Sequence, residues 1–70
     1  MKEKLKKLND YEWLLPKSAR KEMKVAGKVV ANKELLDAME DDTIGQLSNV
    51  CCLPGAVEPV VALPDAHFGY

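Results

Sequence analysis

The sequence predicts an α+β fold in which short strands alternate with two short amphipathic helices. Three observations lead to this prediction: extended apolar runs in the first half, two apolar faces at helical spacing in the middle, and a β-branched run near the end. With 70 residues, the chain makes one small domain at most, and a chain of this size buries only about 60% of the surface that it exposes when unfolded. Apolar residues make up 47% of the sequence, which excludes a disordered chain and is most easily satisfied by a larger body or a partner surface.

The first half of the chain predicts two short strands. Residues 2–8 are mostly helix formers, but their two leucines are too few to hold a helix, so we expect their order to depend on neighbouring elements. Residues 11–15 are rich in aromatic and apolar side chains and are followed by a proline, which predicts an extended segment anchored by Trp13. Residues 28–31 follow Gly27 and predict a second short strand.

The middle of the chain predicts the two helices. Asn32 is a favourable N-cap for the first, which we expect to end near residues 40–42. Its apolar face consists of Leu35, Leu36 and Met39. Thr43 and Gln46 match a capping box for the second helix, which runs to about Cys52. Its apolar residues are Ile44, Leu47, Val50 and Cys51.

The end of the chain predicts a turn followed by a third strand. Pro54 and Gly55 stop the second helix and turn the chain. Residues 56–63 form an apolar run with β-branched side chains, and Pro64 closes it. We therefore expect a strand over residues 60–63 that is buried on at least one face.

The two cysteines are adjacent, at positions 51 and 52, so a disulfide between them would be strained. The chain has no second pair with which to build a disulfide framework or a zinc site. We expect both to be reduced thiols, and at least one to occupy a core position at the helix end, because cysteine is among the most buried residue types.

Charge is unevenly distributed along the chain. Residues 1–25 carry eight basic and four acidic side chains, whereas the remainder carries two basic and seven acidic ones. The basic segment over residues 1–25 either contacts RNA phosphates with release of counterions or is a solvated, fraying terminus. The sequence leaves both interpretations open. A lysine-rich start without an apolar leader, and no run near the roughly 20 apolar residues of a membrane span, lead us to expect a cytoplasmic protein without membrane association.

Asp65 and His67 are the candidate catalytic residues. They lie two positions apart, so in an extended segment they project to the same side. A carboxylate and an imidazole on one side share a proton, orient a metal ligand or coordinate a metal together with other groups. The alternative is structural: Asp65 caps the turn after Pro64, and His67 is satisfied by the backbone.

Two motifs give the chain a family resemblance. The first is NVCCLPG at residues 49–55, and the second is VVALPDAHFGY at residues 60–70. Together they resemble the N-terminal portion of the RtcB family of RNA ligases, in which an N-V-x-x-L-P-G turn precedes an apolar strand and a P-D-x-H-x-G-Y stretch. Residues 13–16 and 25–31 resemble the opening of that family more weakly. The resemblance implies that residues 1–70 are the N-terminal segment of an RtcB-like ligase domain several times longer.

The resemblance also implies a chemistry. RtcB-type ligases join RNA ends bearing a 2′,3′-cyclic phosphate or a 3′-phosphate to 5′-hydroxyl ends, in tRNA splicing and RNA repair, using GTP and Mn²⁺ through a guanylylated histidine. It implies an active-site wall formed by Asp65 and His67, RNA (tRNA halves) as partner, and leaves open an activating protein partner. The family's metal ligands and guanylylated histidine fall downstream, and neither Cys51 nor Cys52 matches its metal-binding cysteine. We therefore expect the chain alone to be inert and to bind neither GTP nor Mn²⁺ tightly.

A second reading comes from a different class. In it the chain is a small freestanding interaction module, whose Trp13, two helices and 60–63 strand form a docking surface for a partner protein.

Overall fold

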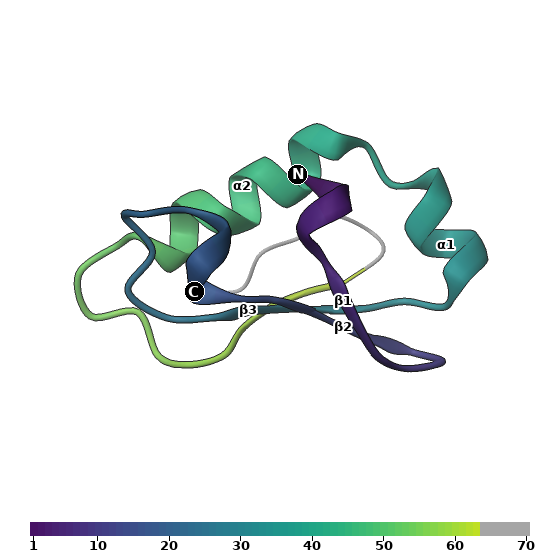
Figure 1. Cartoon of the computed structure of the whole chain (residues 1–70), viewed down its shortest axis with the longest axis horizontal. Helices are drawn as coiled ribbons and strands as arrows, with labels where there is room; N and C mark the ends of the chain where they lie inside the picture. Colours follow the sequence, from purple (N-terminus) through teal and green to yellow (C-terminus); the bar gives the residue numbers. More distant parts are fainter. Residues whose placement is uncertain (64–70) are drawn as a thin grey trace.

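The computed structural model describes residues 1–63, which form a sheet covered by helices (Figure 1). The sheet contains four strands in the order β1-β2-β3-β4. These strands are β1 (Lys6–Asn9), β2 (Glu12–Leu15), β3 (Gly27–Val30) and β4 (Val60–Ala62). β1, β2 and β3 are antiparallel neighbours, whereas β4 runs parallel to β3. The α+β class predicted from the sequence is confirmed.

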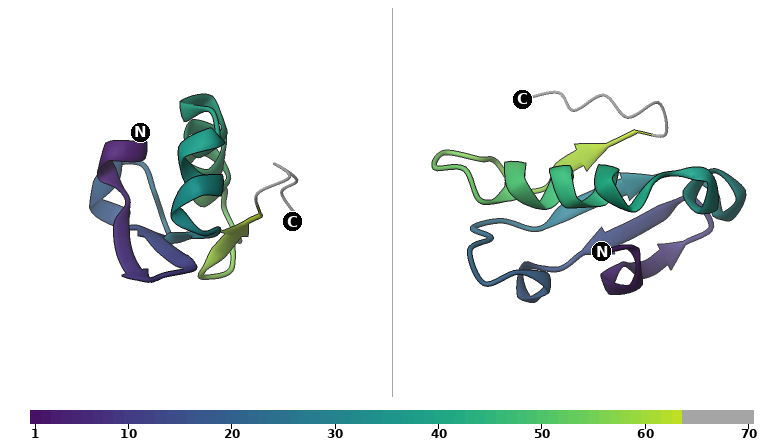
Figure 2. Two further views of the ribbon diagram at one scale, coloured as in Figure 1. Left: turned by 90° about the vertical axis from the view of Figure 1, so that its right-hand side faces the viewer. Right: turned by 90° about the horizontal axis from the view of Figure 1, so that it is seen from above.

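Two α-helices connect β3 to β4 and lie on the same side of the sheet (Figure 2). They are α1 (Lys33–Ala38) and α2 (Asp41–Cys51), and two short 3₁₀ helices, η1 (Lys2–Lys4) and η2 (Lys17–Ala19), precede β1 and follow β2. The left-hand view of Figure 2 shows α1 and α2 above the sheet, so the opposite face is covered by neither. Within residues 1–63 no helix has the length and apolar character required to cross a membrane.

β2 shows the alternation of a strand buried on one face. Trp13 and Leu15 point into the core, whereas Glu12 and Leu14 are half-buried on the other face. The indole Nε1–H of Trp13 donates a hydrogen bond to the backbone oxygen of Ala31 at 2.8 Å, which ties β2 to the end of β3. The extended segment predicted over residues 11–15, with Trp13 as its anchor, is confirmed.

Residues 2–8 form η1 and then the edge strand β1. β1 pairs with β2 through Lys6 opposite Leu14 and Lys7 opposite Trp13. All four residues of β1 are exposed, so backbone pairing with β2 orders this segment, and no apolar seam is needed. The expectation that its order depends on neighbours is confirmed.

Asn32 caps α1 as the sequence predicts. Its Oδ1 accepts a hydrogen bond from the backbone N–H of Leu35 at 2.8 Å. The helix ends at Ala38, earlier than the predicted residues 40–42. The backbone becomes extended at Met39 (φ −71°, ψ 141°), whose side chain is in the core and only 7% exposed.

α2 begins earlier than predicted. Glu40 is its N-cap, so the capping box predicted from Thr43 and Gln46 is wrong. Thr43 lies inside the first turn, where its backbone N–H donates to the oxygen of Glu40 at 3.0 Å. Asp41 and Asp42 also occupy this turn, where carboxylates interact favourably with the helix dipole and favour the earlier start.

The chain turns after α2 and enters β4. α2 ends at Cys51, one residue before the predicted end. Gly55 has a φ of 82°, a left-handed conformation that glycine adopts without strain and that fits the predicted Pro-Gly turn. β4 confirms the strand predicted over residues 60–63, except that Leu63 lies just beyond it.

The hydrophobic core lies between α2 and the sheet. Its buried side chains are Trp13, Leu15, Met23, Val29, Ala31, Leu36, Met39, Ile44, Leu47, Val50, Cys51, Val60 and Ala62. α2 approaches β3 closely at Gly27, where an added Cβ would lie 3.0 Å from Leu47 Cγ and 3.2 Å from Cys51 Sγ. Both distances are tighter than ordinary van der Waals contact, so the missing side chain of Gly27 sets how near α2 packs.

We expect Gly27→Ala to lower the free energy of unfolding by about 1–3 kcal/mol, because its methyl group would push α2 away from β3. Gly45→Ala is the matched control: no atom lies within 4 Å of its added Cβ, and alanine in a helix interior adds about 0.5–1 kcal/mol of stability. Urea denaturation of both variants measures the difference. Equal effects from the two substitutions would show that α2 does not pack on Gly27.

Candidate functional site

The two candidate catalytic residues, Asp65 and His67, lie outside the described residues. The structure does describe the strand that leads to them. Val60 and Ala62 of β4 are buried in the core, so the backbone three residues before Asp65 is held by packing. Because β4 is parallel to β3, with Val29 opposite Ala62, the carboxyl ends of both strands lie at the same end of the sheet. Open α/β sheets bind ligands just beyond the carboxyl ends of their strands.

Among the described side chains near this end of β3 are Asn32 and Lys33, in the segment that follows the strand. Lys33 Nζ lies 6.0 Å from the centroid of the Trp13 ring and forms an ion pair with Asp37 at 2.8 Å. The Asn32 side chain is occupied as the cap of α1. Within residues 1–63 no group of three His, Cys, Asp or Glu side chains is arranged to hold a metal ion.

Cys51 is a structural thiol. It is fully buried at the end of α2, and both cysteines are free, as predicted. Burial, helped by the charges of Cys52 and Glu58, raises the pKa of the Cys51 thiol to about 11. Burial and the raised pKa keep Cys51 a neutral thiol in the core, which disfavours attack on a substrate or binding of a metal, because both need the thiolate.

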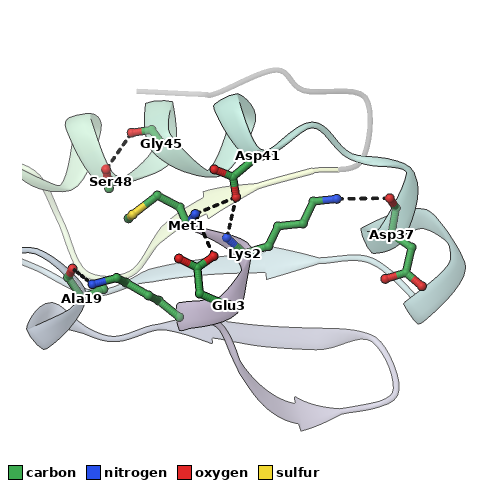
Figure 3. A network of polar contacts seen from close by, with 9 residues as sticks. Met1, Lys2, Glu3, Ala19, Asp37, Asp41, Gly45 and Ser48 are labelled. Atoms are coloured by element: carbon green, nitrogen blue, oxygen red, sulfur yellow. Dashed lines mark hydrogen bonds and ion pairs between the residues drawn. The ribbon is translucent and has the colours of Figure 1, made fainter.

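The basic N-terminal segment is tied to both helices (Figure 3). Asp41 Oδ1 accepts hydrogen bonds from the amino group of Met1 at 2.6 Å and from the backbone N–H of Lys2 at 2.8 Å. Lys2 Nζ donates to the backbone oxygen of Asp37 at 3.1 Å. The hydrogen bond from the Met1 amino group, with that from Lys2, holds the pKa of Asp41 below its ordinary value. These hydrogen bonds hold Met1 and Lys2 against the helices, whereas a fraying terminus would form no such contacts.

Part of the positive charge of this segment is already neutralised. Lys7 pairs with Asp10 at 3.6 Å, and Arg20 pairs with Glu22 at 3.0 Å. The exposed lysines whose side chains form neither an ion pair nor a hydrogen bond within residues 1–63 are Lys6, Lys17, Lys21 and Lys24, whereas Lys4 Nζ donates to the backbone oxygen of Ala19 at 3.1 Å. Contact with RNA phosphates stays a prediction, and these four side chains are the ones available for it.

An apolar groove is the feature that sequence reasoning missed. It has a volume of about 670 Å³ and lies between the end of α2, the loop over residues 53–59 and β4. In the part of the chain that the structure describes, it is lined by Val50, Leu53, Pro54, Gly55, Ala56, Val57, Pro59, Val60, Val61 and Leu63, none of them polar or charged. Val57 is 80% exposed and Leu53 is 46% exposed. Apolar side chains in a Pro-Gly loop, where polar residues are usual, are the sequence signal that points to this groove.

The mixed four-stranded sheet with both α-helices on one face defines the class of protein over residues 1–63 as α+β. Over all 70 residues, the chain is 43% identical to the tRNA-splicing ligase RtcB of Methanocaldococcus jannaschii, of which it covers 7%. It is 45% identical over 62 residues, 89% of the chain, to the tRNA-splicing ligase RtcB of Methanopyrus kandleri, of which that match covers 6%. Identity to the protein of the same name from Pyrobaculum aerophilum is 42% over 67 residues, which are 94% of the chain and 14% of that relative.

The chain belongs to the RtcB family, which confirms the resemblance found in its two motifs. It spans only 6–14% of the length of these three relatives. No protein-family model matches the chain.

We expect the two cysteines to differ sharply in reactivity toward a thiol reagent. With a pKa of about 11, roughly a thousandth of the Cys51 thiol is ionised at pH 8, and the side chain is fully buried, so it should react only as fast as the protein unfolds. Cys52 is half-buried and should react first. Mass spectrometry of Cys51→Ala and Cys52→Ala, labelled separately with iodoacetamide, assigns each rate. Rapid labelling of Cys52→Ala without denaturant would contradict the buried position of Cys51.

Proposed function

We propose that the chain is the N-terminal part of a GTP- and Mn²⁺-dependent RNA ligase. This ligase joins RNA ends bearing a 2′,3′-cyclic phosphate or a 3′-phosphate to 5′-hydroxyl ends, in tRNA splicing and RNA repair. The observation that carries the proposal is the 36–45% identity, over 89–100% of the chain, to relatives named tRNA-splicing ligase RtcB. Because the chain covers a small share of these relatives, the proposal concerns the longer protein.

In this proposal Asp65 and His67 form one wall of the catalytic centre. The buried strand β4 supports it, because a strand fixed in the core delivers the residues after it to a defined point at the sheet edge. Asp65 would act there through its negative charge, orienting neighbouring groups or the RNA end.

The described residues do not fit a manganese or guanylate site by themselves. Residues 1–63 hold no group of three side chains suited to a metal, and Cys51 is protonated at neutral pH. The manganese ligands and the histidine that accepts GMP would therefore come from the remainder of the longer protein. In the proposal the protein works in the cytoplasm on tRNA halves, with Lys6, Lys17, Lys21 and Lys24 available to RNA phosphates, and it leaves room for an activating protein partner.

A second candidate function is the freestanding interaction module. The observation in its favour is that residues 1–63 contain a connected core, with Leu15, Ile44 and Leu47 fully buried. A cooperative melt of a monomeric 70-residue chain would favour this candidate, whereas partial disorder or self-association of the chain would favour the ligase segment.

We expect the 70-residue chain to form no covalent adduct with GMP. Incubation with labelled GTP and Mn²⁺, followed by denaturing electrophoresis, should leave it unlabelled, and the full-length relative from Pyrobaculum aerophilum serves as the positive control. A labelled adduct on His67, the sole histidine of the chain, would overturn the assignment of the nucleophile to the remainder.

We expect Asp65→Asn, made in the longer protein, to lower the ligation rate by at least about 10- to 100-fold while leaving the melting temperature unchanged, because it removes the charge and nearly keeps the shape. Asp37→Asn is the matched control, since it removes an exposed carboxylate that pairs with Lys33 on α1. Ligation kinetics and thermal melts of both variants separate the two readings. An Asp65 that merely caps a turn would tolerate asparagine, so near-normal ligation would remove it from the site.

A further inference from the structure

We propose that β4 and the apolar groove beside it receive a further β-strand from the remaining polypeptide of the RtcB protein. This strand pairs with the free edge of β4 and places apolar side chains in the groove. The inference rests on family membership and on the geometry of β4, and it is independent of the proposed catalytic activity.

The free edge of β4 is the first observation. Within residues 1–63 the sheet ends at β4, which pairs with β3 alone. The backbone N–H of Val60 donates to the oxygen of Ala26 at 3.1 Å, so Val60 faces β3. Because backbone groups alternate along a strand, the N–H and C=O of Val61 point to the open edge. A strand edge of this kind is a template for pairing with another strand.

The groove is the second observation, since it adjoins that edge. Its wall includes Val60, Val61 and Leu63 on one side and the end of α2 on the other. Val61 is 38% exposed, and Val57 extends into solvent from the loop. Among the described residues no cationic or polar side chain lines the groove, so these walls suit apolar side chains better than an RNA phosphate.

The uncovered face of the sheet is the third observation. On the side away from α2, Leu14, Val30 and Val61 surround one ion pair, between Glu12 and Lys28 at 2.5 Å. This face and the edge of β4 are continuous through Val61, so a polypeptide that adds a strand at β4 also begins to cover the face.

The length of the relatives indicates which polypeptide supplies the added strand. The matched segment is 6–14% of the three relatives compared above, so most of each relative lies outside it. A second copy of the chain is a poorer occupant, because β4 has three residues and only Val61 presents both backbone groups outward. One such residue supplies too little contact to hold two separate chains together, since a stable dimer buries at least about 1,200 Å², whereas a strand of the same polypeptide pairs intramolecularly at a high effective concentration.

Hydrogen exchange at Val61 tests the inference. The relative from Pyrobaculum aerophilum is produced with its 67 matching residues replaced by this chain, and the Val61 amide is compared with that of the 70-residue chain alone. The expected result is exchange at least about 100-fold slower in the long protein, because the added strand accepts this N–H. Equally fast exchange in both proteins would overturn the inference. Slow exchange in a dimer of the 70-residue chain would assign the edge to a second copy and overturn it as well.

A pair of substitutions provides the second measurement. Val61→Lys should lower the melting temperature of the long protein by several degrees and leave that of the 70-residue chain nearly unchanged. Leu8→Lys is the matched control, because Leu8 is 51% exposed on β1 at the opposite edge of the sheet. It should change neither melting temperature.

If the long protein does not fold, a binding experiment replaces the melts. The Val61→Lys chain and the unchanged chain are compared in binding to the separately produced remainder of the relative, and equal binding, or no binding, contradicts the inference. A long protein that protects Val61 but does not ligate RNA would contradict the proposed function alone.

Discussion

The packing of α2 on Gly27 is the contact on which the rest of the structure depends. Leu47 and Cys51 occupy the space that a side chain at position 27 would fill, so the lack of that side chain sets the distance between α2 and the sheet. The end of α2 is fastened to the same region, because the backbone oxygen of Cys51 accepts hydrogen bonds from the N–H groups of Lys24 at 2.8 Å and Val25 at 3.4 Å. These bonds satisfy a carbonyl that a helix end leaves without a partner. β4 lies beneath α2, so its position depends on the same contact.

The two family motifs have different structural roles. The first, at residues 49–55, forms the end of α2 and the turn after it, where Val50, Leu53 and Pro54 line the groove. The second begins as β4 and continues into residues that the structure does not describe. Glu58 joins the connecting loop to the sheet, because its carboxylate accepts a hydrogen bond from the backbone N–H of Ala26 at 3.0 Å. The first motif therefore forms the helix end and the turn beside which β4, the start of the second motif, is packed.

Local patterns predicted the elements whose signals lie within a few residues. The Asn32 cap, the extended run around Trp13 and the strand at residues 60–63 are examples, because a capping oxygen or a β-branched run acts over short distances. β1 was not predicted as a strand, since only pairing with β2 orders its exposed residues. The capping box at Thr43 failed because the acidic residues before it also favour a helix start.

The candidate site, like the fold, was predicted only where its signals are local in the sequence. Asp65 and His67 stay a prediction from motif and spacing, and the structure adds the buried strand that precedes them. The groove escaped prediction because its walls come from α2, a loop and β4, which meet only in the folded chain. The close approach at Gly27 was missed for the same reason, since a single glycine before a strand gives no indication of which helix will pack on it.

The parallel pairing of β3 with β4 has a consequence for the order in which the chain folds. The connections over residues 10–11 and 16–26 join β1, β2 and β3, whereas pairing of Gly27 with Val60 closes a longer loop that contains both α-helices. Contacts between distant parts of a chain carry a larger loop-closure entropy and form late. The three-strand meander should therefore assemble first and β4 last, so the strand that leads to the catalytic candidates is also the one whose formation requires the rest of the segment to be in place.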